Sequence, residues 1–341
     1  ATKDAAVTTI NPFVAAPTVE KAVIHFVDDD FYASMDIKGP DLGLGGGDLF
    51  LATKSKTSYP STSVTLTGAQ GFKINFGMKD LFDANFSFAD DGEDVMERKD
   101  FGFKFDATLK AVENLEIYGG VAYTSEEEKV AMAAKASYKL PLGDTMYIKP
   151  SVGFTLKDSA KDLAAALFFG WGAENKEPNF AEFSAATLKT EKYNIANKCS
   201  NGVSIYLGTS NNIKDFNMII GAYDDTLLGG IVTGLAWAFE FDIPDLKKVG
   251  DGWVMDAALK YSNTFADTWT IDANFGLEVV SYKAVDKTET KAGFLYGFGI
   301  STDNTFIQNT KLYAKYSGEH AKDIGAADLK GTITIGTQIH F

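Results

Sequence analysis

The stretch TWTIDANFGLEVV, residues 268–280, alternates between polar or small and apolar side chains from Thr268 to Val279. The apolar positions are Trp269, Ile271, Ala273, Phe275, Leu277 and Val279. The polar or small ones are Thr268, Thr270, Asp272, Asn274, Gly276 and Glu278. Successive side chains of a strand point to opposite faces of the sheet, so this period of two predicts a strand with one apolar and one polar face. The run is much longer than the ~5–6 residues of an average strand in a soluble protein.

The same alternation recurs along nearly the whole chain, for example in FGFKFDATLK (101–110), TMYIKPSVGFTL (145–156) and GWVMDAALKYS (252–262). Several runs reach about ten residues, the length that a tilted strand needs to cross a bilayer. Short turns such as VEN (112–114) alternate with longer charged connections such as 317–328, as in membrane barrels. We therefore predict an all-β fold, a transmembrane antiparallel up-and-down β-barrel of about 16–18 strands.

The composition supports an interleaved pattern and excludes two classes of protein. The 341 residues are 45% hydrophobic, yet the mean hydropathy is only -0.08. No apolar run reaches the ~20 residues of a transmembrane helix, which excludes a helical membrane protein but not one built of strands. The net charge is -14, whereas a nucleic-acid binder normally has a basic face, so no nucleic-acid partner is expected.

We predict a single domain over residues 1–341. Residues 1–28 are expected to be irregular. Residues 172–202 are expected to form a long loop or an insert into the lumen, since connections beyond ~12–15 residues are usually functional or disordered. The glycine-rich GLGGGD (43–48) lacks the Lys-Ser/Thr pair of a phosphate-binding loop and predicts a flexible loop.

Two alanine-rich segments, 125–137 and 158–170, could form helices on propensity alone. They lie inside an otherwise unbroken series of strands. We therefore predict strands for both.

The last residues, GTITIGTQIHF (331–341), form one more alternating run that ends on an aromatic residue. Its apolar face carries Ile333, Ile335, Ile339 and Phe341. This ending resembles the signal by which the barrel-assembly machinery recognises outer-membrane proteins, and the chain as a whole resembles bacterial outer-membrane β-barrels of the porin type. The resemblance implies the bacterial outer membrane as location. It also implies membrane lipid and the assembly machinery as partners, with the terminal aromatic closing the barrel against the first strand.

The sequence departs from general trimeric porins at their constriction. Those proteins set an arginine cluster against acidic residues of an inward-folded loop, but Arg98 is the only arginine here. The PEFGG motif of that loop has only a loose echo in PNFAEF (178–183). The pore size of those porins is therefore not carried over, and a homotrimer stays open as one assembly among others.

The polar faces of so wide a barrel are expected to line water, because a barrel of about sixteen strands leaves an aqueous channel. The charged pore-lining candidates are Lys104, Asp106, Lys149, Asp256, Lys260, Asp272, Glu278, Lys311 and Lys315. Because both signs are present, we expect at most a weak preference for cations. On the apolar face Trp253, Tyr261 and Trp269 are expected in the aromatic girdles at the membrane interfaces.

The function predicted is a porin for passive diffusion of small hydrophilic solutes and ions. One alternative is a plugged surface barrel, acting as an adhesin or a structural outer-membrane protein. Another is a substrate-specific channel of the sugar type, since Tyr147, Tyr206 and Tyr313 fall on polar faces.

No catalytic activity, cofactor or metal is predicted. The histidines are His25, His320 and His340, and none lies in a motif that would position a nucleophile or a base. The acidic stretch DDGED (90–94) lacks the ligand pattern of an EF-hand and is expected to be a solvated loop.

Overall fold

The computed structural model describes residues 23–28, 30–36, 41–47, 49, 52, 59–68, 70–91, 100–172, 184–185, 193–194, 201–226, 231–266, 268–283, 287–304, 307–320 and 330–339. Within these ranges, no helix has both the length and the apolar character that a membrane span requires.

Eighteen strands form one antiparallel sheet in which strands that follow one another in the chain lie side by side. The first half of the sheet consists of β1 (Val23–Val27), β2 (Phe31–Asp36), β5 (Gln70–Met78), β6 (Phe82–Asp90), β7 (Phe101–Leu109), β8 (Leu115–Thr124), β9 (Lys129–Tyr138), β10 (Leu140–Pro141), β11 (Met146–Lys157) and β12 (Ala160–Trp171). The second half consists of β15 (Gly202–Ser210), β16 (Asp215–Asp224), β17 (Leu235–Ile243), β18 (Gly252–Phe265), β19 (Trp269–Lys283), β20 (Thr288–Asp303), β21 (Thr310–His320) and β22 (Lys330–Ile339). The prediction of an all-β, antiparallel, up-and-down fold is confirmed, with the strand number at the top of the expected range.

Three smaller elements complete the described chain. They are the hairpin of β3 (Gly43–Gly45) and β4 (Ser61–Ser63), the hairpin of β13 (Ser184–Ala185) and β14 (Tyr193–Asn194), and the 3-10 helix η1 (Leu246–Asp251).

The strand β10 continues β9 rather than adding a new position to the sheet. Ser137 of β9 pairs with Ser151 of β11, and Leu140 of β10 pairs with Ile148, which is the same register. The 18 strands therefore occupy 18 - 1 = 17 positions side by side. Because all neighbours are antiparallel, the first strand β1 and the last strand β22 run in the same direction.

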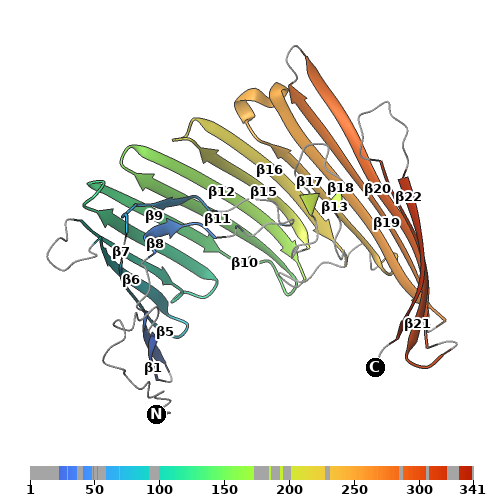
Figure 1. Ribbon diagram of the computed structural model, residues 1–341, viewed down its shortest axis with the longest axis horizontal. Coiled ribbons are helices and arrows are strands. Elements are labelled where there is room, and N and C mark those ends of the chain that lie inside the picture. Colours follow the sequence, from blue (N-terminus) through green and yellow to red (C-terminus); the bar gives the residue numbers. More distant parts are fainter. Residues whose placement is uncertain are drawn as a thin grey trace, which may run out of the picture.

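The edges of the sheet are β1 and β22. Figure 1 shows them at opposite ends of a strongly curved sheet, and none of the pairings between described residues joins the two. From 331 to 339 every side chain of β22 is exposed on both faces, apart from the half-buried Gly336.

Local expectations were confirmed at two segments and corrected at two others. The alanine-rich segments form β9 and β12, as predicted, and the turns before them use the left-handed backbone of Glu128 (φ 52°) and Asp158 (φ 55°). By contrast, β1 lies inside the supposedly irregular segment 1–28, because VIHFV pairs along its full length with β2. Similarly, β3 lies inside the supposedly flexible 43–48, because Gly43–Gly45 pair with β4.

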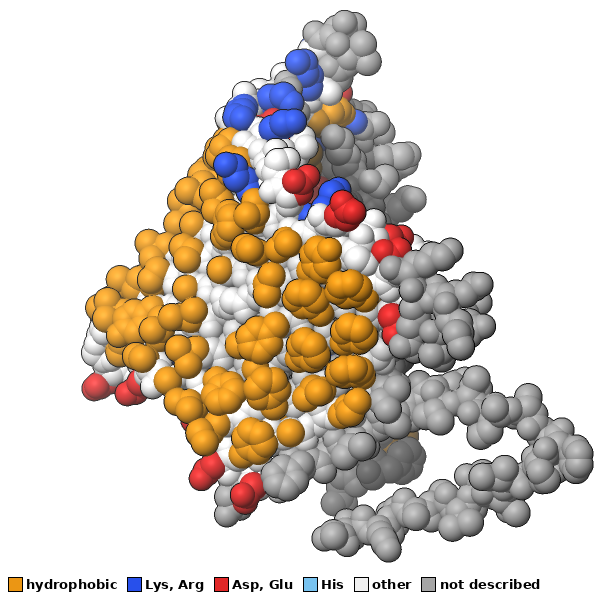
Figure 2. Space-filling model, turned by 90° about the vertical axis from the view of Figure 1, so that its left-hand side faces the viewer, with side chains coloured by type: hydrophobic (Ala, Val, Ile, Leu, Met, Phe, Trp, Pro, Cys, Tyr) orange, Lys and Arg blue, Asp and Glu red, His pale blue; other side chains and the backbone are white. Residues whose placement is uncertain are grey.

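The sheet has one face that carries β3 and β4, here called the inner face, and an apolar outer face. Figure 2 shows large hydrophobic side chains covering one side of the molecule, with charged side chains toward its margins. Among the exposed outer residues are Phe105, Ile117, Met132, Val152, Leu167, Leu207, Phe275 and Phe298. Exposed apolar area on this scale marks a surface that meets another apolar phase.

The tryptophans expected in the girdles lie at opposite ends of the outer face. Trp253 is the second residue of β18, and Trp269 pairs with Phe265 at the other end of that strand. Twelve residues at ~3.3 Å each separate these ends by ~40 Å along the strand, or about 30 Å across a membrane for a strand tilted by ~40°. This equals the ~30 Å thickness of a hydrocarbon core. Tyr261 lies on the same face, and the girdle itself stays a prediction.

Candidate functional site: the inner wall and the segment that crosses it

All nine charged pore-lining candidates lie on the inner face. Cross-strand pairing establishes this, because directly paired residues share a face: Lys104 pairs with Ala122, Asp256 with Glu278, and Lys315 with Thr334. The complete set is Lys104, Asp106, Lys149, Asp256, Lys260, Asp272, Glu278, Lys311 and Lys315.

A segment that the sequence did not single out crosses this face. It is the described part of the connection between β2 and β5, here called the inner segment (41–47, 49, 52 and 59–68), and it contains β3 and β4. Leu42, Leu44, Val64 and Leu66 are its buried apolar anchors. Burial of such side chains contributes roughly 1.5–3 kcal/mol each.

The wall beneath these anchors consists mainly of small residues. The four buried anchors of the inner segment pack on Ala89, Tyr118, Ala122, Ala131 and Ala133 of β6, β8 and β9. A second cluster joins Leu49 to Ala164, Ala166, Tyr206 and Ile219, with Tyr59 packed against it. The segment therefore extends over the inner face from β6 as far as β16.

Glycines on the inner face give the segment its room. A Cβ on Gly120 would lie 2.7 Å from a methyl carbon of Leu44, and one on Gly153 would lie 2.6 Å from the ring of Tyr59. Real Cβ atoms do not approach other atoms so closely, so larger residues at either position would displace the segment.

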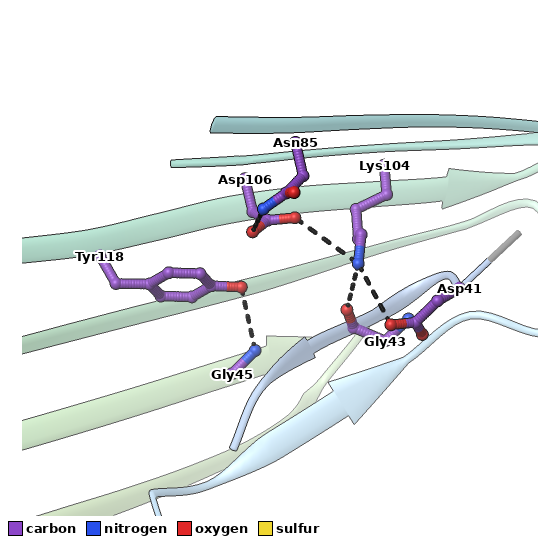
Figure 3. A network of polar contacts seen from close by, with 7 residues as sticks. All are labelled: Asp41, Gly43, Gly45, Asn85, Lys104, Asp106 and Tyr118. Atoms are coloured by element: carbon purple, nitrogen blue, oxygen red, sulfur yellow. Dashed lines mark hydrogen bonds and ion pairs between the residues drawn. The ribbon is translucent and has the colours of Figure 1, made fainter. Parts of the chain in front are cut away.

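A buried lysine ties the segment to the wall (Figure 3). The Lys104 ammonium donates to the Gly43 carbonyl at 3.0 Å and forms ion pairs at 3.5 Å with both Asp41 and Asp106. Asp106 in turn accepts a hydrogen bond of 3.0 Å from Asn85. Lys104 is only 4% exposed, and a buried ammonium is stable only where carbonyl and carboxylate oxygens surround it.

Further contacts fix the backbone of β3 and its neighbours. The Gly45 amide donates to the Tyr118 hydroxyl at 3.1 Å, and Lys135 donates to the Gly46 carbonyl at 2.9 Å. The Lys135 ammonium also lies 4.6 Å from the centre of the Tyr118 ring and 5.1 Å from that of Tyr59. These are distances for cation–π attraction.

The far end of the segment is attached to the turn between β8 and β9. Glu126 accepts from the Thr67 amide at 2.7 Å and from its hydroxyl at 2.8 Å, while Glu127 accepts from the Thr65 amide at 3.3 Å. Glu127 also forms an ion pair with Lys157 at 2.8 Å. The hydrogen bond from Lys157 holds the pKa of the Glu127 carboxyl below its usual value.

Several predicted lining residues are buried rather than exposed to solvent on the inner face. Lys104 and Asp106 lie beneath the inner segment, 4% and 8% exposed. Asp256 and Glu278 are 3% and 4% exposed, in a row with Glu240 across β17, β18 and β19.

The other charged candidates are more accessible. Lys149 is half-buried on β11. Lys260, Asp272, Lys311 and Lys315 come together around a hollow of about 620 Å³ on β18–β22.

The sequence reading missed Asp41, Asn85, Lys135 and Glu240. Lys135 and Glu240 follow the same alternation as the residues that were found, so their period was an available signal. Asp41 had none, because its role depends on a fold of the connection that no periodicity marks.

The remaining expectations fall partly outside the described residues. Ile333, Ile335 and Ile339 are 73%, 79% and 57% exposed on the outer face, while Phe341 lies outside the described ranges. Of residues 172–202, the described internal pieces are β13 and β14, and β13 lies against β19 and β20.

The tyrosines considered for a sugar channel differ in burial. All three lie on the inner face. Tyr147 and Tyr206 are 3% and 6% exposed, whereas Tyr313 is half-buried.

Comparison with known proteins adds little to this geometry. No protein-family profile and no curated protein matches the chain. The solved structure of the KdgM porin matches 76% of this chain and 99% of its own at 12% identity, with a TM-score of 0.18. The KdgM porin in complex with disordered oligogalacturonate matches 71% and 95% at 12% identity, with a TM-score of 0.17. Likenesses with such low TM-scores do not establish a shared function.

Proposed function

We propose that the chain is an outer-membrane channel for passive diffusion of small hydrophilic solutes and ions, narrowed by its inner segment. The observation that carries the proposal is the division of one long-stranded sheet into an apolar outer face and a charged inner face. An apolar surface of this extent is stable in lipid, and a charged one needs water. A sheet in lipid must close, since unpaired edge groups cost several kcal/mol each there. On this proposal, β1 and β22 are brought together in the membrane.

The inner segment would set the pore width. It is held by buried leucines, by Lys104 and by the carboxylates of the β8–β9 turn, so it is a fixed part of the wall rather than a loose loop. Transport through such a channel follows concentration gradients, with selectivity from pore width and lining charge. Insertion through the assembly machinery, by way of the C-terminal aromatic, and homotrimer formation stay predictions.

The second candidate is a plugged barrel with an adhesive or structural role, which the same inner segment favours by covering part of the wall. Swelling of proteoliposomes in neutral sugars of increasing size separates the two. A channel admits the small sugars and excludes the large ones, whereas a plugged barrel admits none. Proteoliposomes that hold correctly folded protein and swell no faster than empty ones would contradict the channel.

A further inference from the structure

The hollow on β18–β22 differs in charge from the rest of the molecule. Its charged lining residues are Lys260, Lys311, Lys315 and Asp272, a balance of 3 - 1 = +2 in a chain of net charge -14. Asp272 already accepts a hydrogen bond of 2.6 Å from Ser262. Within the described part of the chain, Lys311 and Lys315 form no ion pair.

Glycines form the floor of the hollow. Gly297 and Gly299 lie two residues apart on the inner face of β20, between Asn274 and Asp272 of β19 and the lysine-bearing strand β21. Without side chains there, the wall is recessed between its neighbours. The Asn274 amide reaches into this recess, since its Oδ1 lies 2.2 Å from where a Cβ of Gly297 would be.

Hydrogen-bond donors surround the recess, spaced so that several of them can reach one small ligand. Lys311, Tyr313 and Lys315 alternate along β21 on the inner face, so the two lysines are ~13 Å apart at their Cα atoms, with the tyrosine between them. The Lys315 ammonium lies 5.4 Å from the centre of the Tyr313 ring. Flexible lysine side chains of this length can both reach a ligand above the tyrosine, and Gln338 adds an amide from β22.

We propose that this hollow binds a small oxyanion, a phosphate or carboxylate group, on its way through the lumen. Ammonium, phenol and amide donors match the acceptor oxygens of such a group, and charge-assisted hydrogen bonds are the stronger kind. A cation is disfavoured by the positive balance, and an apolar ligand by the polar lining. The inference rests on the proposed function for the words "through the lumen", but binding itself does not require conduction.

The test is equilibrium dialysis of radiolabelled inorganic phosphate, and separately of gluconate, against the folded protein in detergent, with glucose as the neutral probe. Both anions, or one of them, should bind, and glucose should not. Lys311→Gln and Lys315→Gln should each weaken binding by about tenfold to a hundredfold, the loss expected when a hydrogen bond from a charged donor is removed. The matched control is Lys73→Gln, an inner-face lysine of β5 outside the hollow and outside the pore-lining set, which should leave binding unchanged.

Equal binding by wild type, Lys311→Gln and Lys315→Gln would overturn the inference, as would an equal loss in Lys73→Gln or no anion binding at all. Block of single-channel current by the same anions gives an independent reading. A protein that conducts but binds neither anion defeats only this inference. A protein that binds phosphate through Lys315 but never conducts defeats only the proposed channel.

Discussion

At the scale of single residues, the inner face depends on glycines, which leave room for the inner segment, as much as on its charged side chains. Gly119 and Gly120 are neighbours on β8 that point to opposite faces. Nothing lies within 4 Å of a Cβ on Gly119, whereas one on Gly120 would meet both Leu44 and Asp106 at under 3 Å. The sequence shows two glycines in a row, and only the structure distinguishes their roles.

Gly120→Val is therefore expected to push the inner segment off the wall. We expect a wider channel, seen as larger single-channel conductance, and a loss of stability of roughly 1–3 kcal/mol from overpacking. Gly119→Val, on the outer face, is the matched control and should conduct like wild type. Equal conductance of all three proteins would contradict the packing described here.

Lys104→Met should also loosen the segment, because it removes the ammonium between Gly43, Asp41 and Asp106 and leaves a buried carboxylate without its cation. We expect faster proteolysis of the inner segment in the folded protein and noisier channel currents. Lys161→Gln, an exposed lysine at the start of β12, controls for the charge change. Unchanged proteolysis of Lys104→Met would show that the lysine does not hold the segment.

At the scale of elements, the long strands could be predicted from the sequence, whereas β1 and the inner segment could not. Most of the long strands show a period of two, and the alanine-rich β9 and β12 were predicted as strands because they lie inside that otherwise unbroken series. The inner segment has no period. Its leucines, its glycines and Asp41 acquire meaning only when the wall they pack on exists, so reading one stretch at a time gave a flexible loop.

The attachment of the inner segment to the β8–β9 turn predicts a dependence on pH. The pKa of Glu127 is lowered in the folded protein. The Glu127 carboxylate therefore stabilises the attachment of the inner segment fully above the ordinary carboxyl pKa of ~4.3, and this stabilisation is lost as pH falls through the lowered pKa. We expect conductance to be constant at neutral pH and to rise or become noisy only below about pH 4.

Glu127→Gln should give the acidic behaviour at neutral pH. Glu113→Gln, in the exposed turn at the other end of β8, should not. A titration of current with the same midpoint in wild type and Glu127→Gln would assign the effect to another group.

At the scale of the whole molecule, the number of strand positions determines how the barrel can close. Among the described residues the strands occupy 17 positions, so β1 and β22 run in the same direction and direct pairing between them would be parallel, not antiparallel. The alternation that identified the strands carries no information on this point, because it depends on counting every strand and on recognising that β10 continues β9.

Cysteine pairs between β1 and β22, in a Cys199→Ser background, test the closure. In parallel closure, a cysteine moved toward the C-terminal end of β1 pairs with a cysteine moved toward the C-terminal end of β22. Cysteine pairs in this parallel register should therefore cross-link within one chain in membranes. Cross-linking only between cysteine pairs in an antiparallel register, or only between two chains, would contradict parallel closure.

We expect a water-filled path along the inner face, and single-channel recording of the purified protein in planar bilayers would reveal it. We expect discrete, long-lived conductance steps that are linear in voltage. A protein that inserts and remains folded by heat-modifiable electrophoresis, yet produces no steps, would contradict it.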